Sequence, residues 1–288
     1  NYEELPKEIY SIGGGIIQDI SGFIASMIKR GIKWTFIPTT MASQCDSCIG
    51  SKISLNLGGM KNQLGLFYAP EKVIILPNLL NSLPLREYWA GFGEIMHYFL
   101  QKTNESDINL AREYSETLIK NLKPNNYLLT QVLNRSLKIK KTFIEADEFD
   151  QLDRKALNFG HTIAHALEHS TENKIPHGIA VLIGIKIIIN FSENINQYKT
   201  GAEIHSILNK SLKFSYKYWD YDVDQKKLKA ALLRDKKNIK NGFIRIICPS
   251  EANSLSRKLT DMRFMDIKVD QLVEFIIKEF VNLKKRVE

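Results

Sequence analysis

The amino-acid sequence predicts an α/β domain with a parallel sheet over residues 1–80, followed by a mostly α-helical domain over residues 81–288. Two observations support this division. The first part alternates short apolar runs with loops and one helical segment, and this β–loop–α–β order is typical of a parallel sheet. From Pro84 onward, long segments of helical periodicity follow one another. We therefore expect the boundary near residues 78–84.

The first domain is expected to hold three strands, at residues 9–12, 34–37 and 72–76. A glycine run, Gly13-Gly14-Gly15, ends the first of these strands. Isoleucines at helical spacing follow over residues 16–29, and Gly31 stops this helix. Glycines within residues 56–62 predict a tight loop between short strands. The order of these segments is the one that a parallel sheet requires.

The second domain is expected to consist mainly of helices, at residues 86–101, 106–122, 127–146, 156–170 and 178–193. Pro124 and Pro176 lie between helices, where a residue that cannot continue a helix is expected. A short strand at residues 243–247 and a final amphipathic helix at 269–283 complete the predicted elements.

Composition and charge argue against several classes of protein. Hydrophobic residues make up 44% and charged residues 25%, which is typical of a soluble globular chain, and we expect no membrane-spanning run. The net charge is +8, but the lysines are scattered, so we expect no nucleic-acid partner. Three cysteines do not suit a disulfide framework, which favours a reducing, cytoplasmic location. Cys45 and Cys48 form a lone C-x-x-C, for which packing is favoured over a redox or metal role.

Four of the six histidines fall within one short stretch, at His161, His165, His169 and His177. His161 and His165 are four residues apart and therefore share one face of a helix. Glu94 lies on an otherwise apolar helical segment, where a carboxylate needs a partner. Two histidines and one carboxylate with an open position form a catalytic zinc arrangement. The spacing alone leaves open whether His161 pairs with His165 or with His177.

Candidate anion-binding groups are also present. The glycine run at Gly13-Gly14-Gly15 opens a helix, where backbone N–H groups can bind pyrophosphate, although an ordinary turn explains it equally well. Cations and amides lie in glycine-rich or otherwise atypical contexts at Lys52, Lys61, Asn62, Lys140, Arg154, Asn158, Lys236 and Lys237. Arginine and lysine suit carboxylate and phosphate, so together with a metal site these residues indicate a doubly anionic substrate.

A series of short motifs runs in order along the chain: Gly13-Gly14-Gly15-x-x-x-Asp19, Pro38-Thr39-Thr40, Gly50-Ser51-Lys52, Ala90-Gly91-x-x-Glu94, Leu157-Asn158-x-Gly160-His161-Thr162-x-x-His165-Ala166-x-Glu168 and His177-Gly178-x-Ala180-Val181. Together these motifs resemble 3-dehydroquinate synthase, a sugar-phosphate cyclase. The resemblance runs from Gly13 to about Gly184 and then thins to Asp235-Lys236-Lys237. It extends more distantly to the cyclases for aminodehydroquinate, deoxy-inosose and valiolone.

The resemblance implies a lyase of the shikimate pathway of aromatic amino-acid biosynthesis. It would convert 3-deoxy-arabino-heptulosonate 7-phosphate to 3-dehydroquinate and phosphate, with NAD and with zinc or another divalent ion such as Co2+. The implied metal ligands are Glu94, His161 and His177. The implied NAD contacts are Gly15, Ile16, Ile17, Gln18, Asp19, Thr39, Thr40, Asp46, Lys52, Lys61, Leu79, Leu80, Asn81 and Ser82.

The resemblance also implies the residues that meet the anionic sugar phosphate, namely Lys52, Asn62, Lys140, Arg154, Asn158, His165 and Lys236. Family members are homodimers, and Arg30 would reach into the site of the partner subunit. His97 replaces the family's lysine three residues after the zinc glutamate, so we expect it to act in catalysis or substrate choice, or to compete as a ligand. The family's His-Gly-Glu reads His177-Gly178-Ile179 here, so a carboxylate that orients a metal ligand is missing.

Twelve residues precede the glycine run, and three strands are few for a nucleotide-binding half. We therefore expect either a fragment of a longer chain or a shortened nucleotide domain. Two alternative functions stay open. His97 favours a sister cyclase with another sugar phosphate. The short segment before the glycine run and the missing glutamate after His177-Gly178 favour a degenerate, non-catalytic homologue that serves as a binding partner.

Overall fold

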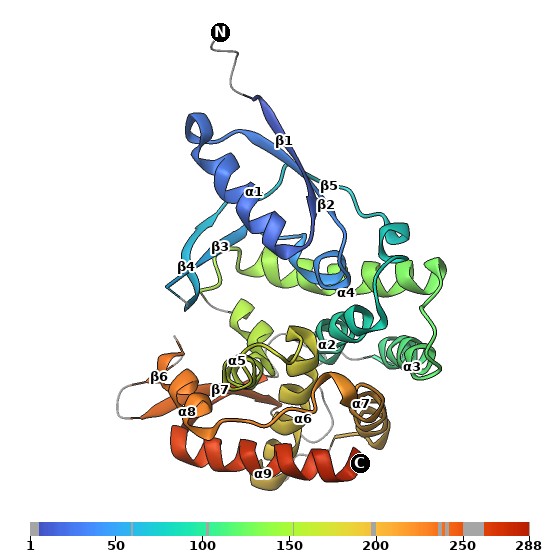
Figure 1. The fold of residues 1–288 in the computed structure, drawn as a ribbon, viewed down its shortest axis with the longest axis vertical. Helices are drawn as coiled ribbons and strands as arrows, with labels where there is room; N and C mark the ends of the chain where they lie inside the picture. The colour runs from blue at the N-terminus through green and yellow to red at the C-terminus, as the bar shows by residue number, and fades with distance from the viewer. Residues whose placement is uncertain are drawn as a thin grey trace. The chain divides into compact units, whose positions relative to one another are not determined.

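The computed structural model describes residues 6–58, 60–101, 104–151, 153–196, 200–235, 238–239, 242–249 and 262–287. The chain divides into two compact units (Figure 1). The first unit contains residues 1–83 and 125–151, and the second contains residues 84–124 and 152–288. The chain therefore leaves the first unit after residue 83, returns to it at residue 125 and leaves it again after residue 151.

The first unit contains a parallel sheet with the strand order β1-β2-β5. Its strands are β1 (Glu8–Gly13), β2 (Lys33–Pro38) and β5 (Lys72–Val73), and β5 is shorter than the run predicted at residues 72–76. Helix α1 (Gly15–Met27) and the turn η1 (Ile28–Arg30) connect β1 to β2. The prediction of a parallel α/β arrangement is thus confirmed.

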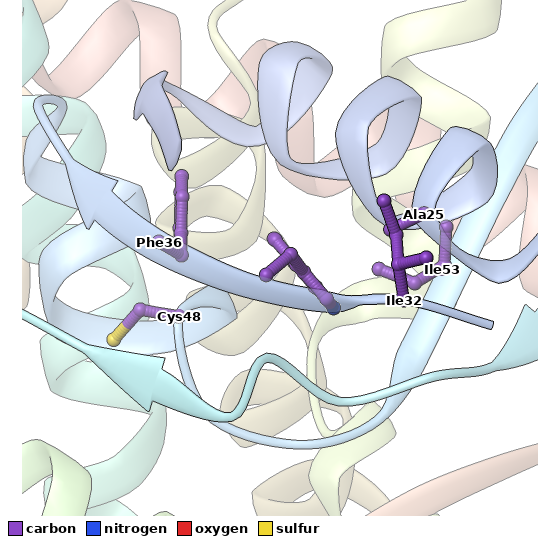
Figure 2. Packing of buried hydrophobic residues seen from close by; sticks show 6 residues of the cluster. Ala25, Ile32, Phe36, Cys48 and Ile53 are labelled. Carbon is purple, nitrogen blue, oxygen red and sulfur yellow. The ribbon is translucent and has the colours of Figure 1, made fainter. Parts of the chain in front are cut away.

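A compact apolar core holds the first unit together. Figure 2 shows side chains of this core, which consists of Ala25, Ile32, Trp34, Phe36, Cys48 and Ile53. Cys45 and Cys48 are both fully buried, and burial raises the pKa of the Cys48 thiol to about 12. A thiol that does not ionise near neutral pH is a poor nucleophile or metal ligand. The burial of both side chains agrees with the packing role that the sequence favoured.

The remaining elements of the first unit pack around this core. Strands β3 (Lys52–Leu57) and β4 (Met60–Phe67) form an antiparallel hairpin, and η2 (Ser43–Ser47) and η3 (Pro77–Leu80) are short helical turns. Helix α4 (Asn126–Ala146) belongs to this unit, although the sequence analysis assigned it to the helical domain. The reason is that Leu137 packs against the core and Lys140 pairs with Asp46.

The second unit is mostly helical, as predicted. Its helices are α2 (Leu85–Gln101), α3 (Glu105–Ile119), α5 (His161–Ser170), α6 (His177–Asn196), α7 (Ala202–Phe214), α8 (Gln225–Arg234) and α9 (Val269–Val287). Its short turns are η4 (Asp153–Asn158) and η5 (Tyr216–Tyr218). Its antiparallel sheet contains β6 (Asn238–Ile239), β7 (Phe243–Pro249) and β8 (Met262–Lys268).

Three predictions about this unit need correction. The helix predicted at residues 156–170 is divided, because Gly160 has a φ of 79° that ends η4 before α5 begins. Helices α7 and α8 and strand β8 were missed. Contrary to expectation, residues His177–Ile195 are long and apolar enough to cross a membrane by length and composition. Since 78% of that segment is buried, it is weak evidence for a membrane span.

Candidate active site

Close contact between α2 and α6 brings Glu94 and His177 together in the second unit. A Cβ atom on Gly93 would overlap the carbonyl group of Gly178, and one on Gly178 would overlap the carbonyl oxygen of Ala90. The two backbones therefore touch where any other residue would separate them. Because Glu94 follows Gly93 and His177 precedes Gly178, their side chains meet beside this contact.

A second glycine contact fixes His161, the first residue of α5. A Cβ atom on Gly184 of α6 would overlap the carbonyl oxygen of Gly160. Gly160 is the N-cap of α5 and adopts a left-handed conformation that favours glycine. The start of α5 is thus held against α6, and His161 lies on the same side as Glu94.

The donor atoms of Glu94, His161 and His177 converge. His177 Nε2 lies 3.1 Å from Glu94 Oε1, and His161 Nε2 lies 3.5 Å from Glu94 Oε2. The three donor atoms all lie within 4.8 Å of one another. Glu94 is 2% exposed, and its Oε1 makes no hydrogen bond of good geometry with the described part of the chain. A buried carboxylate that faces two imidazole nitrogens fits a divalent metal ion.

The outer nitrogens of both rings have acceptors. His161 Nδ1 lies 3.2 Å from the carbonyl oxygen of Phe159, and His177 Nδ1 lies 3.2 Å from Glu168 Oε1. In each ring Nε2 therefore faces Glu94, while Nδ1 faces an oxygen that can accept a hydrogen bond from Nδ1–H. Metal-binding histidines show this arrangement, because the outer hydrogen bond leaves the lone pair on the inner nitrogen.

The charges at this site are strongly coupled. Burial opposes the charged form of Glu94, but the facing imidazoles of His161 and His177 outweigh burial and hold its pKa well below the usual range. Desolvation likewise opposes the charged form of His177, but its contacts with the carboxylates of Glu168 and Glu94 outweigh this effect and raise its pKa to about 10. A metal ion bound to Nε2 of His177 would replace the proton on that nitrogen and would stabilise the Glu94 carboxylate in its place.

Two further histidines surround these residues. The ring of His165 stacks on that of His177, with centroids 5.6 Å apart, and the ring of His97 lies 4.8 Å from that of His161. His97 is 1% exposed. His165, Glu168 and His177 form a second group whose donor atoms lie within 4.8 Å of one another. Glu168 was not singled out from the sequence as a site residue, although its place three residues after His165 puts both on one helix face.

The remaining predicted substrate residues divide between the units. In the second unit, Arg154 is buried in η4, and Asn158 Nδ2 at the end of that turn donates a hydrogen bond to the carbonyl oxygen of Lys155. Lys236 and Lys237 lie outside the described residues. The structure thus brings Glu94, His161, His177, His165 and His97 together and places Arg154 and Asn158 on the turn before α5.

In the first unit, the glycine run meets the residues that follow β2. Thr39 N donates to the carbonyl oxygen of Gly13, and a Cβ atom on Gly14 would lie 2.7 Å from the Thr40 side chain. This contact lies at the carboxyl ends of β1 and β2, the edge at which parallel sheets bind nucleotides. Residues Gly15, Ile16, Ile17, Gln18 and Asp19 form the first turns of α1 at this edge.

Polar contacts order the same region. Gln18 Nε2 donates to the carbonyl oxygen of Ser47 at 2.7 Å, and Asp19 accepts from Ser54 N at 3.0 Å. Burial raises the pKa of Asp19. These contacts fix the first turns of α1 to the segments that contain the other predicted nucleotide contacts.

Two of the predicted cations of the first unit, Lys52 and Lys140, are paired with acids. Lys140 Nζ lies 2.7 Å from Asp46 Oδ1, and Lys52 Nζ lies 2.5 Å from Asp150 Oδ2. Asn62 accepts a hydrogen bond from Ser54 Oγ at 2.8 Å.

The other predicted residues of this unit lie on short elements. Lys61 is on β4, but its side chain is outside the described part of the chain. Leu79 and Leu80 are in η3, and Asn81 and Ser82 follow it. Arg30 is exposed at the end of η1 and has a φ of 65°.

Comparison with known families gives two adjacent matches. Residues 4–90 match the family described as 3-dehydroquinate synthase N-terminal, and residues 91–238 match 3-dehydroquinate synthase C-terminal. The 3-dehydroquinate synthase of Clostridium tetani is 35% identical over 94% of this chain and 68% of its own length. That of Pelagibacter ubique is 43% identical over 64% of this chain and 50% of its own length. The chain thus spans between half and about two thirds of these relatives.

Two solved structures share the fold. One is a 2-deoxy-scyllo-inosose synthase complexed with carbaglucose-6-phosphate, NAD+ and Co2+, with a TM-score of 0.81 at 22% identity. The match covers 95% of this chain and 75% of the synthase chain. The other is a 2-epi-5-epi-valiolone synthase from Streptomyces hygroscopicus with NAD+ and Zn2+ bound, with a TM-score of 0.78 at 22% identity. The match covers 98% of this chain and 75% of that synthase chain. These likenesses confirm the predicted fold class.

Proposed function

This chain belongs to the 3-dehydroquinate synthase family, and on that premise we propose that it converts 3-deoxy-arabino-heptulosonate 7-phosphate to 3-dehydroquinate and phosphate. The reaction is a step of the shikimate pathway, which supplies aromatic amino acids. The observation that carries the proposal is the convergence of Glu94, His161 and His177. A metal-dependent cyclase requires such a donor set.

We propose that these three side chains hold zinc, or Co2+ in its place. The two cyclase structures described above contain Co2+ or Zn2+ together with NAD+. When bound, the metal supplies a Lewis acid that polarises a substrate oxygen, and NAD supplies a hydride acceptor that later returns the hydride. The turn between β1 and α1, Thr39, Thr40, Asp46, Lys52, Lys61 and residues 79–82 are proposed to bind NAD.

The chain's own side chains would bind the substrate and move protons. Arg154 provides a planar fork that suits a carboxylate, and Lys52 and Lys140 provide point charges that suit phosphate. Asn62, Asn158 and Lys236 would complete the anion contacts. His165, stacked on His177, is proposed to transfer a proton, because an imidazole titrates near neutral pH. Arg30 is proposed to serve the partner subunit of a cytoplasmic homodimer.

A second candidate function is a sister cyclase for a different sugar phosphate. His97 supports it, because this imidazole lies beside His161 where the family has a lysine. A lysine is a fixed cation near pH 7, whereas a histidine can be neutral, so the charge that faces the substrate would differ. The two candidates share the metal centre and differ in the anion that fits beside it.

Phosphate release distinguishes these candidates. The full chain would be incubated with NAD and zinc, and with either the heptulosonate phosphate or glucose 6-phosphate. We expect release from the heptulosonate phosphate alone. Release from glucose 6-phosphate instead would favour the sister cyclase. No release from either substrate by protein that holds one zinc per chain would favour the non-catalytic homologue.

A further inference from the structure

Glu168 is a buried carboxylate beside the metal centre to which the proposed function assigns no role. It lies on α5 and is 3% exposed. Its Oε1 lies 3.2 Å from His177 Nδ1, on the opposite side of the ring from Glu94. A charged group so far removed from water is costly unless a partner stabilises it, and His177 is such a partner. The contact joins α5 to the first residue of α6.

The two ring nitrogens of His177 have different partners. Nε2 faces Glu94 at 3.1 Å, within the group of metal-donor atoms. If Nδ1–H donates a hydrogen bond to Glu168, the neutral ring has its lone pair on Nε2, where a metal ion can use it. His161 has the same arrangement, but its outer acceptor is the carbonyl oxygen of Phe159. A carboxylate is a stronger acceptor than a carbonyl oxygen.

We propose that Glu168 is a positioning residue of the metal centre, which fixes the Nδ1–H tautomer and the ring orientation of His177. This role rests on the metal centre of the proposed function. His177 needs such support, because 43% of its side chain is exposed and it begins its helix. The residue at the family's glutamate position, Ile179, is fully buried and apolar. The carboxylate at the outer nitrogen of His177, Nδ1, therefore comes from α5.

A different arrangement of the same atoms makes Glu168 a ligand. His165, Glu168 and His177 could themselves hold a cation, since their donor atoms also lie within 4.8 Å of one another. His177 would then bind the metal through Nδ1 instead of Nε2. The nitrogen that binds the metal is thus the observable that separates a positioning role from a ligand role.

The test compares Glu168→Gln and Glu168→Ala in the full chain, with Glu172→Gln as the matched control. Glu172 lies on the exposed surface just after α5 and pairs with Lys227. Zinc affinity is measured by competition with a chromophoric chelator. The tautomer of His177 is read from 15N NMR of the zinc-loaded protein, with the His177 signal assigned by its loss in His177→Gln.

We expect Glu168→Ala to weaken zinc binding roughly 10- to 100-fold, as for other outer partners of metal-binding histidines. Glu168→Gln is expected to recover most of the affinity, because its amide oxygen can still accept a hydrogen bond from Nδ1–H of His177. Glu172→Gln is expected to match the wild type. In the wild type and in Glu168→Gln, zinc is expected on Nε2 of His177 and the proton on Nδ1.

The role of Glu168 alone is overturned if the wild type binds zinc tightly and Glu168→Ala binds it equally well, or if zinc is found on Nδ1 of His177. If Glu168→Ala fails to fold, the NMR result and the zinc affinity of Glu168→Gln still test whether Glu168 positions His177. Wild-type protein that binds no zinc at all would overturn the metal centre itself, and with it this role. The two failures are therefore distinguishable.

Discussion

Glu94 Oε1 lies 3.1 Å from His177 Nε2, although the two residues come from different helices. This distance depends on Gly93 and Gly178, whose backbones touch at the crossing of α2 and α6. A side chain at either position would move the helices apart and with them the two donor atoms. The proposed metal centre thus depends on this backbone contact as much as on its proposed ligands.

The first prediction concerns this glycine contact. Gly93→Ala places a methyl group inside the Gly178 carbonyl, so we expect a loss of about 2 kcal/mol or more in the free energy of unfolding and a marked loss of zinc affinity. Gly201→Ala is the control, because a Cβ atom there meets nothing within 4 Å. Denaturant unfolding and zinc titration measure both effects. A Gly93→Ala protein as stable and as metal-competent as the control would contradict the role of the contact.

The second prediction separates the histidines. We expect His177→Ala to abolish zinc binding and His165→Ala to spare it, because His177 Nε2 faces Glu94 while His165 stacks on the outer side of the site. The measurement is the zinc content per chain after dialysis. Equal zinc retention by the two variants would show that the ligand assignment is wrong.

The third prediction uses a buried lysine away from the proposed metal ligands. Lys186 is 2% exposed, its Nζ lies 2.7 Å from His205 Nδ1, and burial lowers its pKa from 10.5 to about 8. Between pH 8 and pH 10.5 the unfolded chain holds a proton at this lysine that the folded chain has lost. The free energy of unfolding of the wild type should therefore rise with pH across this window.

Replacing this lysine removes the effect. We expect Lys186→Met to be more stable than the wild type by on the order of 2 kcal/mol at pH 7, after allowance for the absent hydrogen bond to His205. The advantage should shrink as the pH approaches 10. Lys213→Met, at an exposed position on α7, should show no such trend. Urea unfolding at several pH values measures the free energy of unfolding of each protein. Parallel pH profiles of this free energy for wild type and Lys186→Met would refute the role of Lys186.

The sequence predicted the elements whose period is strong and local. The strand at β1, the glycine run, and helices α2, α4 and α9 were found this way. Strand β8 was missed because its position depends on pairing with β7, which no local period shows. Helix α4 was assigned to the wrong unit because its partners lie far away in the sequence: Leu137 of α4 packs against the core of residues 25–53, and Lys140 of α4 pairs with Asp46.

The metal site shows the same limit. The spacing puts His161 and His165 on one helix face but leaves open whether His161 pairs with His165 or with His177, and the choice of His177 came from the family resemblance. Periodicity cannot show that Gly93 and Gly178 touch, yet this contact brings His177 to Glu94. Glu168 was overlooked for a similar reason, because its contact with His177 crosses from one helix to another.

The most direct test of this account is the amount of 3-dehydroquinate formed from 3-deoxy-arabino-heptulosonate 7-phosphate by zinc-loaded chain with NAD, determined by mass spectrometry. We predict one 3-dehydroquinate for each phosphate released by the wild type, and none from Glu94→Ala, which lacks the buried carboxylate that both histidines face. Absence of 3-dehydroquinate with the wild type, or equal amounts with Glu94→Ala, would contradict it.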